Sequence, residues 1–175
     1  KKIKFPIVIK PINEGSSLGV FICKNRTQFI RNYKKLKNEY DRILVEEYIP
    51  GKEIQVAVMG NKALGAIELV PRRQFYDYTA KYSASAKTKH IMPALLSQKK
   101  YKEVLMLARK AHKLLGCRGI TRSDFRFSQN KFYLLETNTQ PGMTKLSLVP
   151  EIANYCGIKF EDLVSWMAKD ASSNR

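Results

Sequence analysis

Residues 120–138 read ITRSDFRFSQNKFYLLETN, two apolar-rich stretches separated by Ser-Gln-Asn, and this pattern predicts a β-hairpin. Side chains two residues apart on a strand project from the same face, so Arg122 lies with Asp124. By the same rule Glu136 lies with Asn138. A tight turn brings Asp124 nearly opposite Glu136, and directly opposed Cβ atoms are ~5 Å apart. The hairpin therefore predicts a cluster of two carboxylates, an amide and a guanidinium.

Asp124, Glu136 and Asn138 together supply hard oxygen ligands, which suit Mg²⁺ or Mn²⁺ bound jointly with a nucleotide. Without a cation the carboxylates of such a cluster would repel each other. The alternative is a surface salt bridge between Asp124 and Arg122, with Glu136 in solvent. The residues alone leave both interpretations open.

A second candidate site lies near the amino end, where Lys10 is followed by the loop EGSSLG at residues 14–19. A lysine at a strand end and a loop of glycine and hydroxyl residues offer a cation and backbone N–H groups to phosphate oxygens. The spacing matches neither GxxxxGK[ST] nor GxGxxG. The alternative is an ordinary turn, for which Gly-Ser-Ser is equally suited.

Acidic residues follow an apolar strand that is predicted over residues 43–49. Glu46 and Glu47 close its apolar part, and Glu53 comes shortly after. Carboxylates beside apolar side chains can contact the amino edge of adenine and the hydroxyls of ribose. The alternative is an exposed strand end.

The long stretch 71–93 is rich in Tyr, Lys, Ser and Ala and has no sustained periodicity. Loops of this length are uncommon within compact domains and tend to be functional. Lys81 and Tyr82 within it could close over a phosphate and a substrate, as a lid does. They could equally be solvent-exposed loop residues.

The order of elements predicts an α+β fold with mostly antiparallel sheets. A helix capped by Thr27 is expected to run to about residue 40. Its expected buried side consists of Phe29, Ile30, Tyr33 and Leu36. A clearer helix is predicted over residues 97–115 and two short ones over 148–171. A boundary near residues 51–53 divides the chain into lobes at 1–52 and 53–175.

The composition narrows the class of protein. A formal net charge of +17 suits nucleic acid, a polyanionic small molecule, or solubility alone. The lysine clusters fall on predicted helices, where a solvated face is the simplest explanation, so we expect no nucleic-acid partner. Three widely spaced cysteines without a CxxC pair predict no disulfide framework or zinc site. The same cysteine pattern predicts a cytoplasmic location, where thiols stay reduced. The apolar runs are shorter than the ~20 residues of a spanning helix, and the amino terminus has no signal-peptide cleavage site.

The successive patterns KPxxEGSSxG, EEYIxGxE, YDYxAKY, RxD and LExNTxPGMTxxSLxP resemble those of D-alanine–D-alanine ligases, which are ATP-grasp enzymes. The resemblance extends from Phe5 to about Pro150. The last pattern, Leu135–Pro150, is the most specific, because its Pro-Gly-Met-Thr and Ser-Leu are typical of this family in particular.

The resemblance implies a two-lobed ATP-grasp fold and ATP-dependent joining of two D-alanines through an acylphosphate, for peptidoglycan synthesis. It implies that ATP is bound by Lys10, Glu14, Ser16, Ser17, Glu46, Glu47, Ile49, Glu53, Lys81 and Leu135. The implied catalytic residues are Ser16, Tyr82, Arg122 and the Gly142 backbone, while the second D-alanine meets Ser147 and Leu148. Two Mg²⁺ or Mn²⁺ ions are assigned to Asp124, Glu136 and Asn138. The full-length enzyme is expected to be a homodimer.

Members of the family also carry an amino-terminal domain and a further ATP-binding lysine upstream. We therefore expect these 175 residues to be part of a longer enzyme and inactive alone. The alternatives are another ATP-grasp carboxylate–amine ligase, a D-alanine–D-lactate enzyme among them, and a non-enzymatic basic module that binds nucleic acid. Tyr82 argues against the lactate enzyme, because the family associates its position with an amine acceptor.

Overall fold

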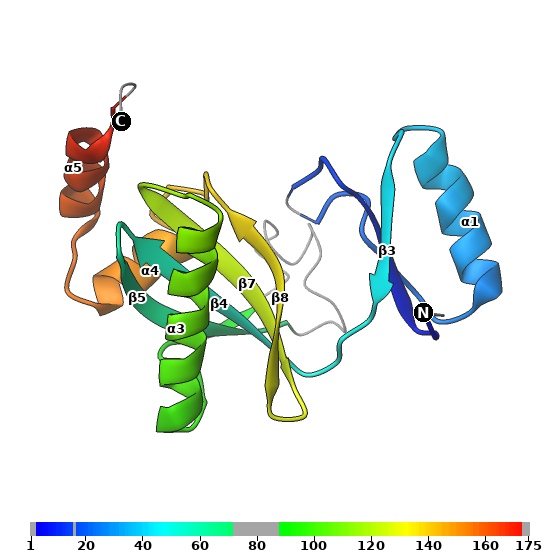
Figure 1. Cartoon of the computed structure of the whole chain (residues 1–175), viewed down its shortest axis with the longest axis horizontal. Helices are drawn as coiled ribbons and strands as arrows, with labels where there is room; N and C mark the ends of the chain where they lie inside the picture. The colour runs from blue at the N-terminus through cyan, green and yellow to red at the C-terminus, as the bar shows by residue number, and fades with distance from the viewer. Residues whose placement is uncertain (1–2, 16, 72–87, 173–175) are drawn as a thin grey trace. The chain divides into compact units, whose positions relative to one another are not determined.

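The computed structural model describes residues 3–15, 17–71 and 88–172. They form two compact units, Lys1–Pro50 with Pro71–Lys89, and Gly51–Val70 with His90–Arg175 (Figure 1). The assignment of residues 1–52 and 53–175 to a central and a carboxyl-terminal ATP-grasp lobe stays a prediction. Among the described residues, no helix combines the length and apolar character that a membrane crossing requires.

In its described residues, the first unit is a three-stranded antiparallel sheet of order β2-β1-β3 with one helix. Its elements are β1 (Ile7–Pro11), β2 (Phe21–Cys23), α1 (Arg26–Lys37) and β3 (Ile43–Glu47). Ile7 and Ile9 are two residues apart on β1, so they project from one face, where they form a small core with Cys23 and Leu36. The opposite face of this sheet therefore carries the alternate residues of β1 and β3.

Helix α1 begins earlier than the predicted Thr27 cap. Asn25 is the N-cap, and its side chain accepts a hydrogen bond of 3.0 Å from the backbone N–H of Gln28. The predicted buried side was also too wide, because Ile30 and Tyr33 are 42% and 39% exposed. A sheet of three short strands covers only a narrow stripe of the helix.

The second unit is a five-stranded antiparallel sheet of order β6-β5-β4-β7-β8 with three helices. Its strands are β4 (Lys52–Met59), β5 (Lys62–Val70), β6 (Lys89–Ile91), β7 (Ile120–Ser128) and β8 (Lys131–Asn138). Its helices are α3 (Gln98–Leu114), α4 (Leu148–Tyr155) and α5 (Phe160–Asp170). The sequence predicted no regular structure up to residue 93, and β6 shows that this was wrong for residues 89–91. A strand of three residues is too short to produce a periodic signal.

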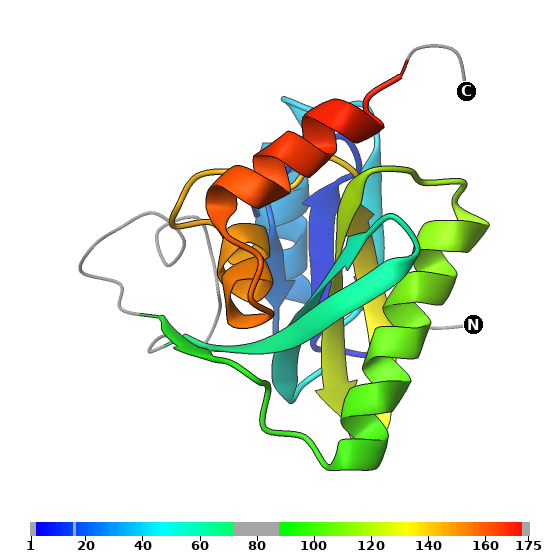
Figure 2. The same cartoon turned by 90° about the vertical axis from the view of Figure 1, so that its left-hand side faces the viewer.

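The two faces of this sheet are covered differently. Helix α3 packs on one face, where Val104 and Ala108 join Ile54, Val56 and Phe125 in the main core. Helix α4 lies on the other face, over β5 and β4 (Figures 1 and 2). The part of that second face formed by β7 and β8 carries the polar side chains of the hairpin. We call it the polar face.

A β-bulge in β8 decides which side chains reach the polar face. Phe132 lies opposite Phe127 on the core face, whereas Glu136 lies opposite Asp124 on the polar face. Regular alternation would put Phe132 and Glu136 on the same face, because they are four residues apart. The register shifts between these pairs, and Leu135 is the extra residue.

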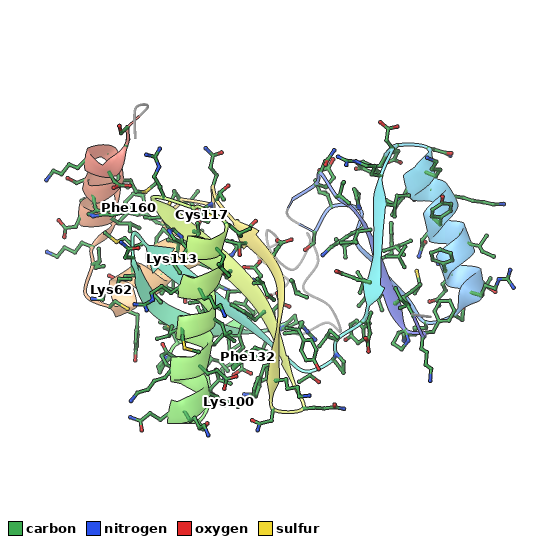
Figure 3. All side chains as sticks on the ribbon, viewed as in Figure 1. Lys62, Lys100, Lys113, Cys117, Phe132 and Phe160 are labelled. Atoms are coloured by element: carbon green, nitrogen blue, oxygen red, sulfur yellow. The ribbon has the colours of Figure 1, made fainter. Side chains whose placement is uncertain are left out.

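Lys100 of α3 contacts the tip of this hairpin. Its Nζ donates to the Asn130 carbonyl at 2.7 Å and to Glu103 Oε2 at 2.8 Å, and it lies 5.9 Å from the centre of the Phe132 ring (Figure 3). We expect Lys100→Met to lower the free energy of unfolding by about 1–2 kcal/mol, because it removes two partly exposed hydrogen bonds to a charged group. Urea denaturation measures this. The neighbouring exposed Lys99→Met is the matched control, and an equal loss in both variants would contradict the prediction.

His112 makes the second unit sensitive to acid. Its side chain is buried on α3, with Nδ1 2.8 Å from Thr121 Oγ1, and burial lowers its pKa. In the unfolded chain the His112 imidazole takes up a proton near pH 6.5, whereas in the folded chain it does so only at a lower pH. Stability should therefore fall as pH drops below about 6.5. Urea denaturation at pH 7.5 and 5.5 tests this. Between these pH values the free energy of unfolding should decrease less in His112→Gln than in the wild type. An equal decrease in both would show that another group causes the sensitivity to acid.

Candidate active site

The hairpin β7–β8 places the predicted cluster on one face. Asp124 lies directly opposite Glu136, and Arg122 lies opposite Asn138. The predicted pairing of the two carboxylates is confirmed. All four side chains thus project from the polar face at neighbouring positions.

Arg122 forms a two-pronged ion pair with Asp124. Its Nε donates to Oδ1 at 2.7 Å and its Nη2 to Oδ2 at 2.9 Å. Asp124 is only 6% exposed. The salt bridge considered as an alternative is therefore present. Because an ionised carboxylate has about four acceptor positions, this ion pair does not by itself exclude a cation.

Glu136 and Asn138 complete the oxygen cluster. Glu136 is exposed, and its Oε1 accepts a hydrogen bond of 3.3 Å from Asn138 Nδ2. That orientation leaves the amide oxygen of Asn138 as an acceptor. Two carboxylates and an amide oxygen are the donor set that Mg²⁺ or Mn²⁺ prefers.

The protein supplies only part of a coordination sphere. In the described part of the chain, no group of three or more His, Cys, Asp or Glu residues is arranged to hold a metal ion. A divalent cation on Asp124 and Glu136 would take its other ligands from phosphate oxygens and water, as Mg²⁺ does at nucleotide sites. The residues present fit a cation that binds together with a nucleotide.

Strand β4 adds polar residues to this face. Glu53 lies opposite Arg126, whose Nη1 is 3.4 Å from Glu53 Oε2. Gln55 lies opposite Asp124 and is 1% exposed. Its Nε2 donates to Glu53 Oε1 at 3.5 Å, and its Oε1 has no hydrogen-bond partner among the described residues. An unsatisfied buried polar group costs about 1–3 kcal/mol.

Gln55 was missed in the sequence analysis. The signal for it was an amide inside the otherwise apolar run Ile54–Met59. A polar residue in the central strand of a sheet calls for a partner or a function, because burial of an amide costs free energy.

The loop after β8 is held by Ser147. Its Oγ accepts a hydrogen bond of 3.1 Å from the Thr144 backbone N–H and lies 2.9 Å from Thr144 Oγ1. Ser147 also precedes the first residue of α4, Leu148, whose side chain is buried. Leu148 can therefore meet a ligand only through its backbone, at the positive end of the helix dipole.

Gly142 packs tightly against that serine. A Cβ at Gly142 would lie 2.9 Å from Ser147 Oγ. We expect Gly142→Ala to displace the hydroxyl and lower stability by about 1–2 kcal/mol, the usual range for overpacking. Thermal unfolding of a double-mutant cycle tests this: the penalty should shrink in a Ser147→Ala background. Equal penalties in both backgrounds would exclude this contact as the cause.

In the first unit, Lys10 and Glu46 share the face opposite the α1 core. Lys10 Nζ lies 2.8 Å from Glu46 Oε1, so the two predicted ligands of ATP form an ion pair. Glu47 lies opposite Ile7 and so belongs to the α1 side. It does not share a face with Lys10. Ile49 follows the end of β3 and is half-buried.

The loop at residues 14–19 is partly described. Leu18 donates its backbone N–H to the Gly15 carbonyl at 3.0 Å, and Ser17 has a positive φ of 61°. Burial, and next the Glu14 carboxylate that it contacts, raise the pKa of Tyr40. Glu14 is thus engaged with a tyrosine. Ser16, Lys81 and Tyr82 lie outside the described residues, and so does most of the predicted lid.

Comparisons with known proteins agree with these observations. The family model described as "D-ala D-ala ligase C-terminus" matches residues 1–169. The chain is 62% identical, over all 175 residues, to a D-alanine–D-alanine ligase of Pelagibacter ubique and covers 57% of that protein.

Solved structures show the same fold. The crystal structure of the Bacillus anthracis D-alanine–D-alanine ligase superposes with a TM-score of 0.83 at 31% identity, over 95% of this chain and 54% of that one. The same enzyme complexed with ATP superposes with a TM-score of 0.80 at 28% identity, over 95% of this chain and 53% of that one. The chain thus spans little more than half the length of these relatives. The predicted α+β ATP-grasp fold is confirmed, and the chain belongs to the D-alanine–D-alanine ligase family, of which it matches the carboxyl-terminal region.

Proposed function

We propose that the protein containing this chain ligates two D-alanines at the expense of ATP. The observation that carries this is the polar face, where Arg122, Asp124, Glu136 and Asn138 converge. ATP phosphorylates the carboxylate of one D-alanine, the amine of the second attacks the acylphosphate, and inorganic phosphate leaves. The dipeptide D-alanyl–D-alanine is the product.

The polar face suits the phosphoryl-transfer step. When bound, two Mg²⁺ or Mn²⁺ ions neutralise the charge on the phosphate oxygens. Asp124, Glu136 and Asn138 hold them, and Arg122 contacts the transferred phosphate while its ion pair with Asp124 fixes its orientation. Phosphoryl transfer needs positioning and charge neutralisation more than covalent catalysis, which is what these side chains provide.

The remaining roles rest on the family. Lys10, Lys81 and the Ser16–Ser17 loop bind the phosphates of ATP, and Glu14 belongs to the same ATP site. The base and sugar meet Glu46, Glu47, Ile49, Leu135 and Glu53. Ser16 and Tyr82 orient the substrate. The Gly142 N–H stabilises the oxyanion with Arg122, as a preorganised donor should.

The second D-alanine binds at the start of α4. Ser147 supplies a hydroxyl, and the backbone N–H of Leu148 lies at the end of the helix that favours a carboxylate. We also infer that the longer enzyme is a cytoplasmic homodimer, as the family suggests.

The test uses the chain extended upstream to the length of its relatives. With Mg²⁺–ATP and D-alanine, it should release phosphate and form the dipeptide in equal amounts, with loss of both in Arg122→Ala. The assay is repeated with D-lactate as the acceptor and with other amino acids as donors. A D-alanine–D-alanine ligase should use D-alanine in both positions, which distinguishes it from other ATP-grasp ligases. Phosphate release without dipeptide, or a salt-sensitive affinity for DNA with no response to Mg²⁺–ATP, would contradict the proposal.

A further inference from the structure

Gln55 occupies a position that the fold alone does not explain. It lies in β4, the central strand of its five-stranded sheet, between Ile67 on β5 and Asp124 on β7. Its neighbours along the strand, Ile54 and Val56, belong to the apolar core on the opposite face. The side chain is 1% exposed, so the amide lies inside the protein and beside the polar face.

The hydrogen bonding of this amide is incomplete. Nε2 makes a long contact of 3.5 Å to Glu53 Oε1, and Oε1 has no hydrogen-bond partner among the described residues. A buried acceptor without a partner lowers stability, whereas an apolar side chain of the same shape would not. A methionine would fill the same space with no buried polar atom. Gln55 therefore does not stabilise the fold. Its contact with Glu53 is the remaining explanation for an amide at this buried position.

We propose that Gln55 is a positioning residue that orients the Glu53 carboxylate toward the ribose hydroxyls of ATP. This inference rests on the proposed function, in which Glu53 faces the ribose. Each oxygen of Glu53 has its own neighbour: Oε1 faces Gln55 Nε2 at 3.5 Å and Oε2 faces Arg126 Nη1 at 3.4 Å. These two donors constrain the orientation of the carboxylate.

The chemistry of the amide suits this task better than a charge would. Ribose presents two adjacent hydroxyl donors, and a carboxylate held in one plane can accept from both. A glutamate at position 55 would stand between Glu53 and Asp124 and repel them. A cation there would pair with Asp124 and compete with Arg122. A neutral donor orients Glu53 without disturbing the metal-binding carboxylates.

The test compares nucleotides with and without ribose hydroxyls. The dissociation constants of Mg²⁺–ATP and of Mg²⁺–2′,3′-dideoxy-ATP are measured on the chain extended upstream. The wild type should prefer ATP, and Glu53→Gln should remove most of that preference. Gln55→Met should reduce it about fivefold, within the range of one hydrogen bond to a charged group, with little change for the dideoxynucleotide. The midpoint of urea unfolding of Gln55→Met should equal or exceed that of the wild type.

Val56→Ala is the matched control, since it weakens the same strand from the core face. It should lower the urea midpoint and leave the preference for ATP unchanged. If Gln55→Met keeps the preference that Glu53→Gln loses, the positioning role is overturned while the ribose assignment stands. If Glu53→Gln keeps the preference, the ribose assignment fails and the inference fails with it. A lower urea midpoint for Gln55→Met than for the wild type would make Gln55 a residue of the fold and overturn the inference as well.

Discussion

Deletion of Leu135 from the extended chain is expected to weaken Mn²⁺-dependent ATP binding by about a hundredfold or more, a loss typical of a disrupted metal site. Leu135 is the extra residue of the bulge between the pairs Phe125–Leu134 and Asp124–Glu136. Without it, strict alternation puts Glu136 on the same face as Phe132. Either the carboxylate turns toward the core under α3, or Phe132 leaves it. The first outcome disperses the oxygen cluster, and we expect it because contacts with Phe127 and Lys100 hold Phe132 in place.

Leu135→Met is the control, because it keeps the number of residues and an apolar side chain of nearly the same volume for the proposed contact with ATP. It should bind Mn²⁺–ATP within a few-fold of the wild type, whereas Glu136→Gln should resemble the deletion. Isothermal titration with and without Mn²⁺ measures all three, and circular dichroism verifies that each variant is folded. Wild-type affinity in a folded deletion variant would show that the bulge does not set the position of the metal ligands.

The 175 residues alone are expected to make no detectable D-alanyl–D-alanine under conditions in which the extended chain turns over. The residues that we propose for metal, phosphate and acceptor binding are present. The relatives are nearly twice as long, however, since this chain covers 57% of one and 54% of another. The family places part of the first D-alanine site in the remainder. Loss of alignment between that carboxylate and the γ-phosphate forfeits much of the ~7–11 kcal/mol that proximity can contribute.

The measurement is dipeptide formation and phosphate release at saturating D-alanine and Mg²⁺–ATP, with both chains at equal concentration. Weak Mg²⁺–ATP binding by the short chain, seen as a shift in its unfolding temperature, would show that it is folded and that the defect lies in substrate alignment. Comparable turnover by both chains would mean that the active site is complete within these residues.

Elements with strong local signals were predicted correctly. Helix α3 lies within the predicted range 97–115, Ser97 is its N-cap, and Val104 and Ala108 of that helix are buried. The hairpin β7–β8 and the two short helices near the carboxyl end also lie close to their predicted bounds. Each of these depends on periodicity, turn residues or caps within a few positions of one another, and such information is contained in a short window of sequence.

Weaker or competing signals led to errors. Asn25 and Thr27 are both good N-caps, but Gln28 favours Asn25: its backbone N–H donates to Asn25, and its side chain accepts from the Lys24 backbone N–H. This local signal was overlooked. Strand β6, in contrast, forms by pairing with β5, because its own three residues give no periodic signal. There, residues outside the local window decide the outcome.

The sequence by itself determined the family, the α+β class and the pairing of Asp124 with Glu136, because motif order, alternation and a tight turn are local properties. Only the tertiary structure decided which face those side chains occupy, since the bulge at Leu135 reverses the alternation along β8. It also decided the neighbours of Gln55, whose nearest polar groups on β7 lie about seventy positions away in the chain. Alternation assigns a face within one strand, but the register between strands distant in sequence depends on how the whole sheet packs.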